Sequence, residues 1–108
     1  MWTCNTCARL CGVGGKERAE RAAAELRERG YDVVGTASTS ASCLMSNARR
    51  LSEESPERDA VLALCCSIGA ECAGRATGKE VSNPVRTLGC GYLDEDGEPR
   101  LTLPLHHI

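Results

Sequence analysis

The chain has few large side chains with which to build a hydrophobic core. Only 3% of its 108 residues are aromatic, with one Trp, two Tyr and no Phe. A buried aromatic side chain removes about 150–250 Å² from water, so a core of Ala, Val, Leu and Ile buries less area per residue. The length suits a single domain covering residues 1–108. We therefore expect cross-links, either covalent or metal-based, to stabilise one small domain.

The chain's eight cysteines are the candidates for these cross-links. The N-terminal sequence MWTCNTCARLC has no apolar segment followed by a small-residue cleavage site, so we expect no secretory signal. No apolar run is long enough to span a bilayer. We therefore expect a cytoplasmic protein with no membrane segment. In that reducing compartment, eight cysteines indicate metal or redox chemistry rather than a disulfide framework.

Several other function classes lack their signatures in this chain. The formal net charge is −2, with basic and acidic residues balanced along the same segments, so we expect no nucleic-acid partner. There is no Walker motif, no GxGxxG and no GxSxG. The only histidines, His106 and His107, stand at the C-terminus, where a frayed tail is the simplest interpretation. A catalytic Cys–His pair is therefore poorly supported.

The clearest predicted element is a helix over residues 16–29. From Ala19 onward, apolar residues recur at i, i+3, i+4 and i+7, which gives one apolar stripe on a charged helix. Gly30 stands where a left-handed C-cap is expected. A continuous apolar run over residues 59–66 predicts a buried central strand.

The other predicted elements alternate between strands and helices. The sequence predicts a strand over 31–36, a loop over 38–42, a helix over 43–52 that ends before Ser55-Pro56, a turn and short helix over 67–78, a short strand over 81–85, and hairpin strands over 87–93 and 100–105. This order predicts an α/β fold: a small three-layer domain with a mainly parallel sheet and a C-terminal β-hairpin.

Three cysteines form a C-x2-C-x3-C run at the N-terminus: Cys4, Cys7 and Cys11. Thiolates at this spacing on a loop can converge on one metal ion or cluster without strain. The same loop contains three glycines that could bring the backbone close and leave amides free to bond sulphur: Gly12, Gly14 and Gly15. We therefore predict that these glycines line the cofactor and that all three cysteines are candidate ligands.

A four-ligand site needs at least one further cysteine. Cys43 stands at the start of a predicted helix, and Cys66 stands at the carboxyl end of the predicted central strand. Binding sites in open α/β sheets gather at the carboxyl ends of strands, so Cys66 and the N-terminal loop are expected to meet. Cys65 should face the opposite side of its strand and be buried. The roles of Cys72 and Cys90 stay open.

Four segments of the chain together suggest a family. They are CNTCARLCGVGGKE at residues 4–17, Cys43, VLALCCSIGAE at residues 61–71 and VSNPVRTLGCG at residues 81–91. In order and spacing, they resemble the cysteine-rich methylenetetrahydrofolate reductase C-terminal domain. That domain is also found in the accessory subunit of bacterial methylenetetrahydrofolate reductase. The resemblance implies that the family's metal-site cysteines correspond to Cys4, Cys7, Cys11, Cys43 and Cys66. It also implies an iron–sulphur or zinc centre and a flavin- or corrinoid-dependent one-carbon enzyme as partner.

Three functional hypotheses follow. The first is an accessory or electron-transfer module with a 4Fe-4S cluster, favoured because its ligands come from three distant segments beside glycine amides. The second is a structural zinc module, and the third is a thiol-redox protein using Cys4 and Cys7. We expect no catalysis by the chain alone, because Glu71, Arg86 and Thr87 at the same edge form no catalytic set.

Overall fold

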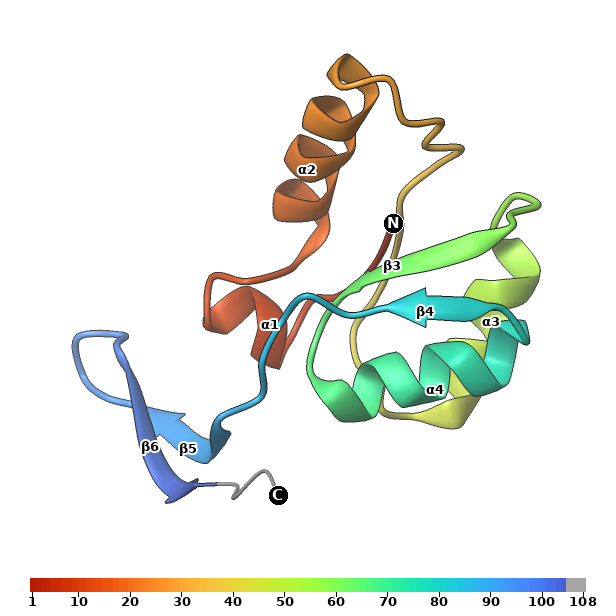
Figure 1. Cartoon of the computed structure of the whole chain (residues 1–108). Helices are drawn as coiled ribbons and strands as arrows, with labels where there is room; N and C mark the ends of the chain where they lie inside the picture. Colours follow the sequence, from red (N-terminus) through yellow and green to blue (C-terminus); the bar gives the residue numbers. More distant parts are fainter. Residues whose placement is uncertain (105–108) are drawn as a thin grey trace.

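The computed structural model describes residues 1–104 and shows a mixed α/β fold (Figure 1). Its centre is a four-stranded parallel sheet in the order β2-β1-β3-β4. The strands are β1 (Trp2–Cys4), β2 (Ala37–Thr39), β3 (Ala60–Leu64) and β4 (Glu80–Ser82). β1 pairs with β2 on one side and with β3 on the other, so Trp2 lies opposite both Ala37 and Ala63. The mainly parallel sheet and the central place of β3 are confirmed.

Four helices connect and flank these strands. They are α1 (Cys7–Leu10), α2 (Lys16–Glu28), α3 (Met45–Glu54) and α4 (Ser67–Thr77). Successive strand residues point to opposite faces, and β1 shows what covers each face. Trp2 packs in a core with residues of α3 and α4, whereas Thr3 accepts a hydrogen bond from the Gly15 amide just before α2. The sheet therefore has α3 and α4 on one face and α2 on the other (Figure 1).

The core is built from small side chains around one large one. Trp2 is 2% exposed, and most of the buried residues near it are alanines and cysteines. Its indole Nε1 donates a hydrogen bond to the hydroxyl of Ser42 at 2.8 Å. A buried indole N–H needs a hydrogen-bond partner, so the bond from Trp2 to Ser42 also holds the loop after β2 against the core.

The predicted strand over residues 31–36 is wrong. The strand after α2 is β2, Ala37–Thr39, which overlaps the segment predicted as a loop. The 13 residues of α2 rise by about 20 Å, so the chain must run back along the helix before it can pair with β1. Tyr31 and Val34 lie in this return segment and are 64% and 54% exposed. Pairing with β1, rather than local β-propensity, decides where the strand begins.

The other helix predictions agree with the structure to within a few residues. α2 ends just before Gly30, whose φ of 92° is the left-handed conformation expected of a C-cap glycine. α4 ends at Gly78 in the same way, with φ of 68°. Within residues 1–104, no helix has the length and apolar character needed to cross a membrane.

A C-terminal hairpin is confirmed and extends away from the sheet (Figure 1). It consists of β5 (Gly89–Leu93) and β6 (Pro99–Pro104), which pair antiparallel. Its turn is closed by the Asp94 carboxylate, which accepts hydrogen bonds from the amides of Asp96 and Glu98 and from Arg100. The predicted second strand extended to residue 105, and this residue, like His106 and His107, lies outside the described residues.

Candidate metal centre

The carboxyl ends of three adjacent parallel strands carry the five predicted ligands. Cys4 is the last residue of β1, and the chain continues directly into α1, which begins at Cys7 and is followed by Cys11. Cys43 lies in the loop between β2 and α3, and Cys66 lies between β3 and α4. Because β2, β1 and β3 are neighbours and run parallel, their following loops meet at one edge of the sheet.

The five thiols differ in accessibility. Cys7, Cys11 and Cys43 are exposed, and Cys66 is half-buried. Cys4 is buried, and its thiol donates a hydrogen bond to the carbonyl of Ser40 at 3.4 Å. Four of the five predicted ligands are therefore accessible at the edge, whereas the fifth, Cys4, is buried and its thiol already forms a hydrogen bond.

The other four predicted ligands all affect the pKa of the Cys7 thiol. Burial raises the pKa of the Cys7 thiol, and the nearby Cys4, Cys66, Cys11 and Cys43 raise it further because several thiolates would repel one another. Within the part of the chain that the structure describes, however, no three His, Cys, Asp or Glu side chains are already arranged to hold a metal ion. The thiols lie at the same edge of the sheet, but they are not arranged in a coordination geometry.

Hydrogen bonds hold the Cys43 loop in place from both sides. The carbonyl of Ser40 also accepts from the hydroxyl of Thr6, which joins this loop to the start of α1. Ser42 accepts from the Trp2 indole and donates to the carbonyl of Gly69 in α4 at 2.9 Å. The loop after β2 is therefore tied to both cysteine-bearing segments beside it.

Cys66 occupies the N-cap of α4, with φ of −67° and ψ of 166°. Its sulphur accepts a hydrogen bond from the Gly69 amide at 3.5 Å. Two further residues lie close by: Asn83, which the sequence did not assign to this edge, and Thr87, which it placed there without a role. The Asn83 side chain donates to the carbonyls of Ala63 and Cys65, and the Thr87 hydroxyl accepts from the Ser67 amide. The signal in the sequence was Asn83-Pro84, which lies inside the segment predicted as a short strand over 81–85.

The remaining cysteines fall outside the edge. Cys65 is fully buried, as predicted, and burial and the neighbouring Cys66 and Cys4 raise the pKa of its thiol to about 12. Cys72 is buried between α3 and α4, with its thiol directed to the carbonyl of Cys43 at 3.8 Å. Cys90 is exposed on the hairpin. Cys65 and Cys72 are therefore buried in the core, and Cys90 lies on the surface.

The expectation that the loop glycines present free amides is wrong. The amides of Gly12 and Gly14 donate to the carbonyls of Arg9 and Ala8, and the Gly15 amide donates to the hydroxyl of Thr3. A β-carbon on Gly14 would lie 2.4 Å from the carbonyl oxygen of Leu64. Gly14 therefore lets the segment after Cys11 pack closely on β1 and β3, which is a structural role.

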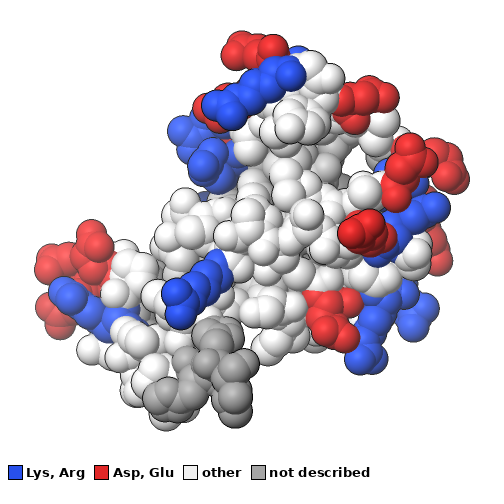
Figure 2. Space-filling model, in the orientation of Figure 1, with Lys and Arg blue, Asp and Glu red and all other residues white. Residues whose placement is uncertain are grey.

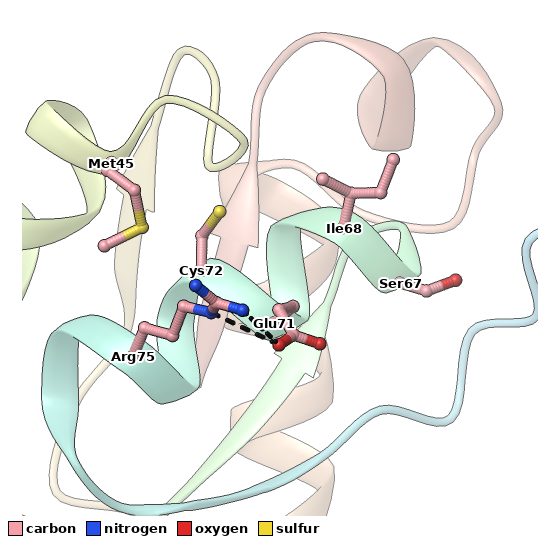
Figure 3. Close-up of a pocket in the computed structure, with 6 residues that line it drawn as sticks. All are labelled: Met45, Ser67, Ile68, Glu71, Cys72 and Arg75. Atoms are coloured by element: carbon pink, nitrogen blue, oxygen red, sulfur yellow. Dashed lines mark hydrogen bonds and ion pairs between the residues drawn. The ribbon is translucent and has the colours of Figure 1, made fainter.

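A shallow hollow of about 290 Å³ lies between α3 and α4, and none of the five predicted ligands lines it (Figure 3). Its lining residues are Met45, Ser67, Ile68, Glu71, Cys72 and Arg75. Glu71, which the sequence placed near the edge, is 64% exposed and forms an ion pair with Arg75 one turn further along α4. This pair is a solvated helix contact and does not form an acid–base site.

Comparisons of the chain with protein-family models, with curated proteins and with solved structures gave no match.

Proposed function

We propose that this chain is a metal-binding accessory domain whose cysteines hold an iron–sulphur cluster at the carboxyl edge of the sheet. The proposal rests on the topology, which brings thiols from the loops after β2, β1 and β3 to one edge. Soft thiolates are the ligands of both iron–sulphur clusters and structural zinc. The donor set therefore fits this group in chemistry and in location, although the thiols must move closer to bind it.

We infer that Cys7, Cys11, Cys43 and Cys66 are the four ligands. All four are accessible, whereas Cys4 is buried and its thiol is bonded to a backbone carbonyl. Cys4 would then lie beneath the centre, where its S–H can bond a ligand sulphur or stay with Ser40. A bound cluster would supply a one-electron redox couple, and these residues would set its position at the surface of the domain.

The thiol-redox alternative has less support. A reactive C-x-x-C pair needs a thiol with a lowered pKa that stands free to attack. Here Cys4 is buried, and the pKa of the Cys7 thiol is raised by burial and by its neighbours. Structural zinc remains the second candidate because the same ligands suit it and because the small-residue core would gain folding energy from a bound metal.

Exposed apolar side chains beside the thiols support an accessory role. Leu10 and Leu44 adjoin Cys11 and Cys43 in the sequence and are 47% and 54% exposed, and Ile68, two residues after Cys66, is 65% exposed. On the face seen in Figure 2, charges of both signs lie mainly around the rim and the middle of the face is largely uncharged, while one basic side chain lies near α1. Such a surface suits docking onto another protein in the cytoplasm. A flavin- or corrinoid-dependent one-carbon enzyme as that partner rests on the motif resemblance alone.

Anaerobic purification with metal analysis and a visible spectrum tests the metal centre. We expect brown protein with about four irons per chain, as a 4Fe-4S cluster requires. Colourless protein with stoichiometric zinc would replace the cluster by the zinc alternative. Protein that retains neither metal, and takes up neither on anaerobic reconstitution with reduced thiols, would refute the proposed centre.

A further inference from the structure

The two peptide groups on either side of Cys66 are each held by a side chain from the segment after β4. The carbonyl of Cys65 accepts a hydrogen bond from the Asn83 amide nitrogen at 2.9 Å. The amide of Ser67 donates to the Thr87 hydroxyl oxygen at 2.9 Å, and the Ser67 hydroxyl lies 2.7 Å from the same oxygen. Orientation of these two peptide groups determines φ and ψ of the residue between them, and so the direction of its side chain.

The sequence around Asn83 explains why a side chain is needed here. Backbone pairing between β3 and β4 ends at Leu62 and Ser82. Pro84 has no N–H, so it has no amide with which to extend the ladder. The Asn83 amide nitrogen instead donates to the carbonyl of Ala63 in β3 at 2.8 Å and to that of Cys65 just after β3. The segment after β4 is thereby drawn across the end of β3 and brings Thr87 to the start of α4.

We propose that Asn83 and Thr87 are positioning residues that hold the Cys66 thiol toward the other cysteines at the sheet edge. The inference rests on the proposed metal centre for its functional meaning, since Cys66 is one of the four proposed ligands. Asn83 and Thr87 do not bind the metal. Their role is to fix the backbone of Cys66 before the metal arrives, so that less ordering is required on binding.

The experiment measures cobalt affinity and Cys66 reactivity in the full chain. Co²⁺ is the probe because thiolate-to-cobalt charge-transfer absorption reports how many cysteines ligate it. The variants are Asn83→Ala and Thr87→Val, with Thr87→Ser as the conservative rescue and Ser82→Ala as a neighbouring control. In each variant, the rate at which iodoacetamide alkylates Cys66 is followed by peptide mass spectrometry, with exposed Cys90 as the internal reference.

We expect Asn83→Ala and Thr87→Val to weaken Co²⁺ binding by about 10–100-fold, the range found for residues that orient metal ligands. In the same variants, Cys66 alkylation without metal should accelerate by about fivefold, as the loss of one net hydrogen bond predicts. Thr87→Ser and Ser82→Ala should behave as the parent chain. Circular dichroism and the fluorescence of buried Trp2 check that each variant is folded.

An unchanged Cys66 alkylation rate in both folded variants overturns the inference, whatever happens to Co²⁺ affinity. Failure of the metal proposal is a separate result. If the parent chain binds neither Co²⁺ nor a cluster, the metal centre is refuted, and the alkylation rates still decide whether Asn83 and Thr87 hold Cys66. If one variant does not fold, the other decides, because Asn83 and Thr87 contact opposite sides of Cys66.

Discussion

Substitution of Gly14 by Ala is the sharpest test of how the cysteine loop packs on the sheet. A β-carbon at this position would lie 2.4 Å from the Leu64 carbonyl oxygen, 2.7 Å from the Ala8 β-carbon and 2.8 Å from the Thr3 hydroxyl oxygen. The first of these atoms belongs to the backbone of the central strand and cannot turn aside. The segment that carries Cys7 and Cys11 must therefore move away from β1 and β3.

The energetic cost has two parts. Overpacking of a close-packed site costs about 1–3 kcal/mol. The displaced loop would also disturb the buried Thr3 hydroxyl, which donates to the Leu64 carbonyl at 2.7 Å and accepts from the Gly15 amide at 2.8 Å. A buried polar group left without its partner costs about 1–3 kcal/mol. We expect Gly14→Ala to lower the free energy of unfolding by about 2–6 kcal/mol. This is a large fraction of the total unfolding free energy of a typical domain, which is roughly 5–15 kcal/mol.

Urea denaturation under reducing conditions, followed by Trp2 fluorescence and circular dichroism, measures this change. Gly74→Ala is the matched control, because its β-carbon meets only the Val81 side chain at 3.5 Å, an ordinary contact. Inside α4, that substitution should stabilise the protein by about 0.5–1 kcal/mol through helix propensity. If Gly14→Ala is as stable as Gly74→Ala, the packing of the loop against β1 and β3 described above is wrong.

Three further predictions concern other parts of the molecule. Ser42→Ala removes the partner of the Trp2 indole and should cost about 1–3 kcal/mol of unfolding free energy, and an unchanged urea midpoint would contradict this. The pKa of the Asp94 carboxyl is lowered from 3.8, first by the Glu98 amide and then by Arg100. Its stabilisation of the hairpin turn is therefore present above pH 3.8 and lost as the pH falls through the lowered value, a transition that NMR should detect in the parent chain and not in Asp94→Asn. Cys43→Ser should reduce bound iron or zinc measured by elemental analysis while Cys90→Ser leaves it unchanged, and equal metal contents in the two variants would remove Cys43 from the ligand set.

Local sequence determined the elements whose stabilisation is itself local. The apolar stripe beginning at Ala19 predicted α2, and Gly30 and Gly78 marked two helix ends because only glycine adopts a left-handed cap at low cost. The apolar run that became β3 predicted a buried strand, and Cys65, which lies directly after β3, is buried as predicted. The turn residues between β5 and β6 likewise predicted the hairpin.

Tertiary pairing decided the elements that local sequence assigned wrongly. β2 begins at Ala37 because that is where the chain meets β1, although Val33, Val34 and Thr36, which suggested a strand, lie before it. The loop glycines showed the same limit: sequence analysis treated their amides as free, but folding brings those amides to Arg9, Ala8 and Thr3. Register and loop hydrogen bonds depend on which distant residues come together, and a residue's own neighbours in the chain carry no information about that.

The candidate metal centre combines both kinds of information. The spacing of Cys4, Cys7 and Cys11 and the position of Cys66 after an apolar run were enough to predict a site at the carboxyl edge of a sheet. Accessibility then separated buried Cys4 from the four exposed or half-exposed thiols. The sequence placed Thr87 near this edge, but the bonds that Asn83 and Thr87 make became visible only in the fold, because the Cys65 carbonyl and the Ser67 amide lie 18 and 20 residues earlier in the chain.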